Sequence, residues 1–151
     1  MIVKPSADSI ATAARMAAQG KGLPPVEKWN PPFCGDLDIR ISRDGTWFYL
    51  GTPIGRPELA RLFSTILKRE GEKYFLVTPV EKVGIQVDDA PFLAVDFEAT
   101  GAGEAQVLRF TTSMGDKTTA SSENPIRVVR DPASGEPSPY VRVRRNLDAL
   151  I

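Results

Sequence analysis

The dipeptide Asp44-Gly45 lies between two stretches of alternating apolar and polar residues, and it constrains the fold more than any other feature of the sequence. Asp-Gly favours a two-residue type I′ turn, because both central residues of that turn need positive φ angles. Such a turn pairs Ser42 with Trp47 and sends alternate side chains to opposite faces of a hairpin. The predicted core face carries Leu37, Ile39, Ile41, Phe48 and Leu50, and the opposite face carries Asp36, Asp38, Arg40, Ser42, Trp47 and Tyr49. The second set is too polar for a dry core and too aromatic for an ordinary surface, so we expect something to cover it.

A helix is predicted directly after the hairpin, over residues 57–71. Pro57 suits a first helical position, and Gly71 is a natural end. Apolar residues repeat along it at the spacing of one buried helix face: Leu59, Leu62, Phe63, Ile66 and Leu67. The apolar run at 73–78 then predicts a central strand, so the order β-β-α-β is expected for residues 35–80.

The N-terminal segment, residues 1–34, is predicted to hold a helix followed by a proline-rich arm. Residues 6–19 are rich in alanine, and Ser6 or Asp8 can cap a helix that Gly20 ends. Two Pro-Pro pairs in residues 20–33 exclude regular helix and central strand. We expect an extended arm with Val26, Trp29 and Phe33 against the folded body; a polyproline ligand for a partner domain is the less favoured interpretation.

Residues 81–151 are expected to be all-β. Short β-rich runs separated by Gly and Pro predict strands at 83–87, 92–99, 106–112, 117–120, 126–129 and 140–143. Asn146 can cap a helix over 146–151, and the sequence stops before such a helix is complete.

The absence of histidine restricts the chemistry of this chain. It excludes Ser-His-Asp and Cys-His triads and HExxH zinc sites. Cys34 is the only cysteine, so no internal disulfide forms, and an idle thiol is favoured over a nucleophile. No apolar run is long enough to span a bilayer and no signal peptide is recognisable, so we expect a cytoplasmic protein. No metal-binding or nucleotide-binding motif stands out, so we expect no cofactor. Net charge is zero, but residues 79–123 are net acidic and the segments on both sides are net basic.

The hairpin and the helix entrance are two regions that carry candidate sites. Asp36 and Asp38 can share a divalent cation or a proton, but a structural ion pair with Arg40 explains them more simply. Trp47 and Tyr49, together with Arg40, can form a platform for a base or a protein partner, or be buried between the two halves of the molecule, and we weigh these evenly. Arg56, at the helix entrance, can bind an anion, although no phosphate-loop pattern accompanies it.

A basic cluster near the C-terminus is the third candidate region. It consists of Arg127, Arg130, Arg142, Arg144 and Arg145. Nucleic-acid binding is one interpretation, and a solvated edge strand that discourages aggregation is the more common one.

Four motifs resemble the bacterial domain-of-unknown-function family numbered 1285. They are Asn30-Pro31-Pro32-Phe33-Cys34-Gly35-Asp36-Leu37-Asp38, Gly45-Thr46-Trp47-Phe48-Tyr49, Thr52-Pro53-Ile54-Gly55-Arg56-Pro57 and Val77-Thr78-Pro79-Val80-Glu81-Lys82. The resemblance implies an α+β protein of two related halves, the second similar to a pleckstrin-homology-like barrel, with a ligand cleft between them. It also implies a signalling or interaction role, a shortened C-terminal helix, and a junction near Glu81 and Lys82.

Our leading hypothesis is a non-catalytic binding module that recognises a protein, or less favourably a nucleic acid, at the cleft between the halves. The predicted ligand-binding residues are Arg40, Trp47, Tyr49, Arg56, Glu81 and Lys82. The alternative is an enzyme that uses Asp36 and Asp38 with a cation, or Arg56 with an anionic small molecule. The sequence leaves the oligomeric state open.

Overall fold

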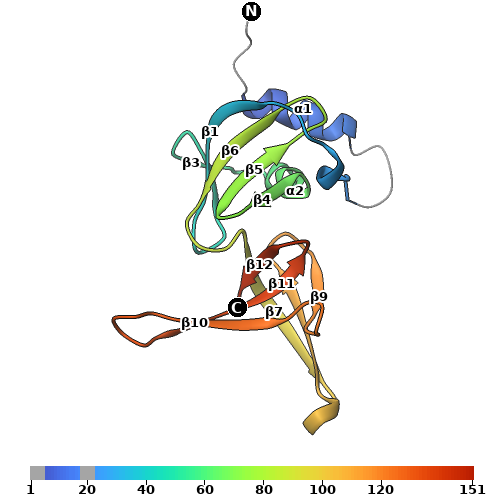
Figure 1. Cartoon of the computed structure of the whole chain (residues 1–151), viewed down its shortest axis with the longest axis vertical. Coiled ribbons are helices and arrows are strands. Elements are labelled where there is room, and N and C mark those ends of the chain that lie inside the picture. Colours follow the sequence, from blue (N-terminus) through green and yellow to red (C-terminus); the bar gives the residue numbers. More distant parts are fainter. Residues whose placement is uncertain (1–5, 18–22) are drawn as a thin grey trace, which may run out of the picture. The chain divides into compact units, whose positions relative to one another are not determined.

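Two six-stranded sheets, with α-helices beside the first of them, make up the computed structural model, which describes residues 6–17 and 23–151 (Figure 1). The predicted α+β class is confirmed. The chain divides into two compact units, Met1–Ser42 with Thr46–Asp88, and Arg43–Gly45 with Asp89–Ile151. No helix among the described residues is long and apolar enough to cross a membrane.

The first unit contains both α-helices and one mixed sheet. Its elements are α1 (Ala7–Ala17), the 3₁₀ helix η1 (Val26–Lys28), β1 (Phe33–Ile41), β2 (Trp47–Tyr49), β3 (Thr52–Pro53), α2 (Pro57–Thr65), β4 (Leu67–Glu70), β5 (Lys73–Val77) and β6 (Lys82–Val87). The strand order is β3-β2-β1-β6-β5-β4, with β1 and β6 parallel and the other neighbours antiparallel. We expected β6 in the second half of the chain, but its pairing places it in the centre of the first sheet.

The hairpin register predicted from Asp44-Gly45 is wrong by one residue. Ile41 pairs with Trp47, and the amide of Ser42 donates to the carbonyl oxygen of Thr46, which leaves a loop of three residues. Gly45 has a φ of 87°, as expected for the left-handed residue of a three-residue loop with a bulge. Because side chains alternate along a strand, this shift exchanges the two faces of β2. Trp47 therefore lies in the core and Phe48 on the opposite face.

The core of the first unit lies between the sheet and its helices. Trp47 is 3% exposed and stacks on Phe63 of α2, with ring centroids 6.3 Å apart. Helix α1 contacts α2 and buries Ile10 completely. The hydroxyl of Ser6 accepts a hydrogen bond from the amide of Ser9, as predicted for a capping residue, whereas the predicted helix end at Gly20 lies outside the described residues. Val26 of the arm is buried as expected, but Phe33 is exposed.

Helix α2 ends six residues earlier than the sequence predicts. It stops at Thr65, and Leu67 pairs with Leu76 as the start of β4. Thr65 and Ile66 are β-branched and favour strand over helix. Gly71 has a φ of 64° in the turn between β4 and β5, so the glycine that resembles a helix end serves a hairpin.

The second unit is a sheet that curls on itself. Its elements are β7 (Phe92–Thr100), the 3₁₀ helix η2 (Gly103–Ala105), β8 (Val107–Thr112), β9 (Lys117–Thr119), β10 (Ile126–Arg130), β11 (Pro137–Arg144) and β12 (Leu147–Leu150). The order is β10-β11-β12-β7-β8-β9, with β12 and β7 parallel. The hydroxyl of Thr118 on β9 donates to the carbonyl oxygen of Arg142 on β11, although three strands lie between β9 and β11 in this order, so the sheet bends toward a half-barrel. The helix predicted over 146–151 is wrong, because these residues form β12 between β11 and β7.

Candidate functional site

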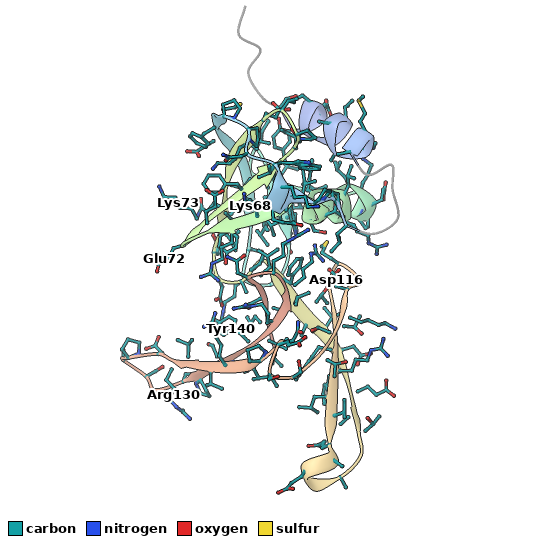
Figure 2. All side chains as sticks on the ribbon, turned by 45° about the vertical axis from the view of Figure 1, so that its right-hand side comes forward. Lys68, Glu72, Lys73, Asp116, Arg130 and Tyr140 are labelled. Atoms are coloured by element: carbon teal, nitrogen blue, oxygen red, sulfur yellow. The ribbon has the colours of Figure 1, made fainter. Side chains whose placement is uncertain are left out.

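The face of the first sheet that lies opposite α2 is open to solvent in the first unit; we call it the outer face. Leu37, Ile39 and Ile41 point to the buried side, so alternation sends their neighbours outward. The strand registers carry the same face across the sheet. The outer face consists of Phe33, Asp36, Asp38, Arg40, Phe48, Lys68, Glu70, Phe75, Lys82 and Gln86. Figure 2 shows Lys68 on β4 and Lys73 at the start of β5.

A hollow lies at the centre of the outer face, where Gly84 has no side chain. Asp36 pairs with Gly84, and a Cβ atom added there would lie 2.2 Å from Oδ1 of Asp36. Two shallow cavities of about 360 and 320 Å³ meet at this point, and Asp36, Gly84 and Gln86 line both. Asp38 lines the first cavity and Phe75 the second. A glycine in the middle of a strand thus creates the space, and a carboxylate fills part of it.

Aromatic rings and cations lie next to one another around this hollow. The guanidinium of Arg40 lies 5.0 Å from the ring centroid of Phe48, and Nζ of Lys82 lies 4.5 Å from that of Phe75. Phe33, which is 55% exposed, meets Phe75 edge to face at 6.0 Å. Such rings and cations attract one another and present apolar area to solvent at the same time.

Two sets of ion pairs hold the charged groups of the outer face. Arg40 Nε lies 3.0 Å from Oδ2 of Asp88, so the expected pairing of Arg40 with Asp36 and Asp38 is wrong. Nζ of Lys82 donates to Oε1 of Glu70 at 2.9 Å, and Lys68 lies 3.5 Å from the other oxygen of Glu70. The hydrogen bond from Lys82 lowers the pKa of Glu70 below its usual value. All these side chains keep contact with solvent, so their pairs are weak and exchangeable.

The six predicted ligand-binding residues do not come together. Arg40 and Lys82 lie on the outer face, on neighbouring strands. Trp47 lies in the core, and among the described residues its Nε1 has no hydrogen-bond acceptor. The carbonyl oxygen of Glu81 accepts the amide of Thr78 in the turn before β6.

Tyr49 and Arg56 share a separate groove at the entrance of α2. This groove has a volume of about 250 Å³ and is also lined by Thr52 and Leu59. Tyr49 pairs with Ile39, which places it on the helix side of the sheet. Arg56 occupies the N-cap position of α2 and makes no side-chain capping bond there.

The arginine cluster of the second unit is engaged in contacts within that unit. Arg127 and Arg142 both pair with Asp148, whose side chain is 5% exposed. Arg144 pairs with Asp116 and lies over the ring of Phe92, and burial lowers the pKa of its guanidinium. Arg130 donates to the carbonyl oxygen of Gly135. Asp148, within the basic segment, and Asp116, outside it, thus neutralise three of its arginines.

Several residues of the outer face were not among the candidates that we took from the sequence. Phe75 lies in a run that predicts burial on both sides, yet only Leu76 and Val77 of β5 are buried. A usable signal was present in β6, where Lys82, Gly84 and Gln86 alternate with Val83, Ile85 and Val87. This alternation predicts a strand with one buried and one open face. Within residues 6–17 and 23–151, no group of three or more His, Cys, Asp or Glu side chains is placed to hold a metal ion.

Comparisons with known proteins identify the family. The model described as the N-terminal domain of the domain of unknown function DUF1285 matches residues 24–90, and the model of its C-terminal domain matches residues 91–151. No curated protein matches the chain. A crystal structure of a DUF1285 family protein from Silicibacter pomeroyi DSS-3 is 62% identical, with 94% of this chain and 77% of that chain covered and a TM-score of 0.86.

A second solved structure is more distant. It is a DUF1285 family protein from Shewanella baltica OS155, with 36% identity, 74% of this chain and 81% of that chain covered, and a TM-score of 0.57. The two family models together span most of the chain. The chain therefore belongs to the DUF1285 family.

Proposed function

We propose that this chain is a non-catalytic binding module and that it recognises a segment of a partner protein through the outer face of the first sheet. The observation that carries the proposal is the exposure of Phe33 beside Phe75 and Lys82, next to the hollow at Gly84. Helix α2 covers one face of the sheet, and the other keeps aromatic side chains in solvent. Aromatic and arginine side chains next to small depressions are typical of the residues that dominate protein interfaces.

The charged groups favour a polypeptide over a nucleic acid as the ligand of this face. Lys68 and Lys82 are neutralised by Glu70, and Arg40 by Asp88. Asp36 and Asp38 add negative charge beside the hollow. A surface of this mixed sign lacks the excess positive charge that phosphate backbones require. A signalling role, and a pleckstrin-homology-like relationship of the curled second unit, are parts of the same proposal.

A random peptide library displayed on phage tests the proposal. We expect selected peptides to bind the wild type, and to bind Phe33→Ala and Gly84→Ala at least about ten-fold more weakly. Gly84→Ala displaces the Asp36 carboxylate and fills the hollow. Phe97→Ala is the matched control, because Phe97 of the second unit is also a largely exposed ring, at 63%. Peptides that bind both outer-face variants as tightly as the wild type would overturn the assignment of this surface.

An enzyme that uses Asp36 and Asp38 is the second candidate, since both carboxylates line the cavity of about 360 Å³. Thermal melts with magnesium, calcium and manganese test it, because a ligand that binds only the native state raises the melting temperature. The rise must disappear in Asp36→Asn and persist in Asp96→Asn, a matched carboxylate on β7 of the second unit. Melts with phosphorylated metabolites test the anion alternative in the same way, with Arg56→Ala.

A further inference from the structure

Strand β10 forms one end of the second sheet and exposes all five of its residues. It pairs with β11 on one side only. Ile126, Val128 and Val129 expose 39%, 54% and 47% of their surface. Figure 1 shows β10 and β11 as a hairpin of the second unit, and Figure 2 labels Arg130 near its end. An open edge of this composition is a template for a further strand.

The hydrogen-bond pattern of the hairpin identifies the backbone groups that face outward. The amide of Asp131 donates to Glu136, and that of Arg142 donates to the carbonyl oxygen of Pro125. Bonded and non-bonded pairs alternate in an antiparallel ladder, so residues 127, 129 and 131 direct their N–H and C=O groups toward β11, as Pro125 does its C=O group. Ile126, Val128 and Arg130 therefore direct theirs away from the sheet. Among the described residues, none of these three has a backbone partner on that side.

Strand β4, the corresponding strand of the first unit, is covered by a neighbouring segment, whereas no such segment covers β10 among the described residues. Both sheets have the same order, and β4 occupies in the first the position that β10 occupies in the second. Strand β4 contacts the 3₁₀ helix η1, and Leu67 at its start is fully buried. Every residue of β10 is exposed instead.

We propose that a second copy of this chain binds at β10, antiparallel, with the two-fold axis at Val128. In this register Val128 faces the second copy's Val128, and Ile126 faces its Arg130. All three outward-facing residues of each copy are then paired, which makes six backbone hydrogen bonds. A shift by two residues in either direction leaves an outward-facing residue of each copy unpaired.

The side-chain charges agree with this register. Arg127 lies opposite the second copy's Val129, so no arginine directly faces an arginine across the new ladder. A shift by two residues toward Ile126 brings the two Arg127 side chains face to face, which is unfavourable for like charges. Arg127 is already neutralised by Asp148 within its own unit. A strand with the sequence Ile-Arg-Val-Val-Arg therefore accepts its own copy, and accepts it best when centred on Val128.

The contact is small, since five residues on each side bury less area than the roughly 1,200–2,000 Å² of a stable complex. We expect a reversible dimer that forms at about 100 μM or above. Sedimentation velocity from about 10 μM to 1 mM measures it. A sedimentation coefficient that stays at the monomer value over this range would overturn the proposal.

Val128→Pro is the decisive variant. Proline has no N–H, and the lost donor is the outward one, so the bonds between β10 and β11 remain. Each dimer loses two hydrogen bonds, and we expect the dissociation constant to rise at least about ten-fold. Thr119→Pro places the same residue on β9 at the opposite end of the sheet and should leave the dimer unchanged. Dimerisation that survives Val128→Pro, or that is lost in Thr119→Pro, would contradict β10 as the interface.

A cross-linking experiment does not depend on the folding of a proline variant. In a Cys34→Ser background, Val128→Cys places two thiols across the two-fold axis with Cα atoms about 5.5 Å apart, within disulfide range. We expect rapid oxidation to a covalent dimer. Val95→Cys is the control, because Val95 is 58% exposed on β7 of the same unit. Equal rates for the two variants would mean random collision, and pairing with a strand of another protein would leave Val128→Cys monomeric.

Discussion

The two units share a strand order but cover their sheets differently. In each unit, the first three strands form one antiparallel set and the last three strands form another. The first and the sixth strand of the unit lie side by side at the centre of the sheet and run parallel. The first unit inserts α2 between its third and fourth strands, whereas the second has only the short connection from β9 to β10. The first sheet therefore packs one face against helices, and the second bends until β9 reaches β11. One topology thus gives an open outer face in one unit and a curled sheet in the other.

The ion pairs of the two units also differ in their exposure to water. On the outer face of the first sheet, Arg40 and Asp88 pair while both keep contact with water. In the second unit, two arginines surround Asp148 where water is excluded from the carboxylate. Removing one partner of a buried pair is costly, whereas a surface pair contributes little. The carboxylate of Asp148 in the second unit is therefore less accessible to water than that of Asp88 on the outer face of the first sheet.

The largest expected effect tests the helix-covered core. Trp47→Ala removes a ring stacked on Phe63 and should lower the free energy of unfolding by about 4 kcal/mol. Phe48→Ala, on the outer face, should cost about 1 kcal/mol. Urea denaturation followed by circular dichroism measures both. Equal losses of stability in the two variants would contradict the observed register and favour the two-residue turn, which places Phe48 in the core.

The buried carboxylate of the second unit gives the next largest effect. Asp148→Ala leaves Arg127 and Arg142 without their shared partner, and we expect a loss of about 2 kcal/mol in the same denaturation experiment, because both guanidinium groups lose charged hydrogen bonds but keep contact with water. Asp88→Ala breaks the exposed pair of the first unit and should cost less than about 1 kcal/mol. A comparable loss in both variants would remove the contrast between the units.

Tyr140 adds a pH dependence to the second unit. Burial raises the pKa of its hydroxyl, and the hydrogen bond to Asp89 raises it further. The folded protein then holds this proton more tightly than the unfolded chain, so its contribution to stability is complete below about pH 10, the unfolded value. That contribution is lost as the pH rises through the folded pKa. Ultraviolet titration of tyrosinate should show a late-ionising group that Tyr140→Phe removes; a titration curve that Tyr140→Phe leaves unchanged would contradict it.

The smallest effect is expected on the outer face. Lys82→Ala should change stability by less than about 1 kcal/mol, because both side chains of the pair with Glu70 keep contact with water. The pKa of Glu70 should rise toward its ordinary value when the hydrogen bond is gone. Its contribution to stability, present above about pH 4.5 and lost as the pH falls through the folded value, should shrink accordingly. NMR titration of the Glu70 side chain measures this, and an unchanged pKa would contradict the pairing.

Particular elements show where local sequence sufficed. Ser6 capped its helix as expected, and six strand predictions between residues 83 and 143 matched β6 to β11 within a few residues. These succeed because capping and alternation depend on neighbouring residues only. The turn at Asp44-Gly45 was located correctly, but its length was not, since Asp-Gly is compatible with a two-residue turn and with a longer loop that uses Gly45 alone.

The candidate site was only partly predictable for the same reason. The sequence indicated a polar and aromatic face on β1, which we expected to be covered, and singled out Arg40 on that face and Lys82 at the junction of the halves. The sequence did not predict that Arg40 forms its ion pair with Asp88, or that Phe48 lies on that face instead of Trp47. Both outcomes depend on strand pairing, and a one-residue change of register exchanges every side chain of a strand between its faces.

Composition and short-range periodicity are enough to establish the α+β class, the position of most strands and the exclusion of histidine chemistry, because that information lies in neighbouring residues. The tertiary structure decided that residues 67–70 and 147–150 become strands, that β6 joins the first sheet, and that Asp148 gathers two arginines. These outcomes follow from strand pairing and burial, to which weak local preferences yield, whether the partners are near in the chain, as for β4 and β5, or distant, as for β12 and β7.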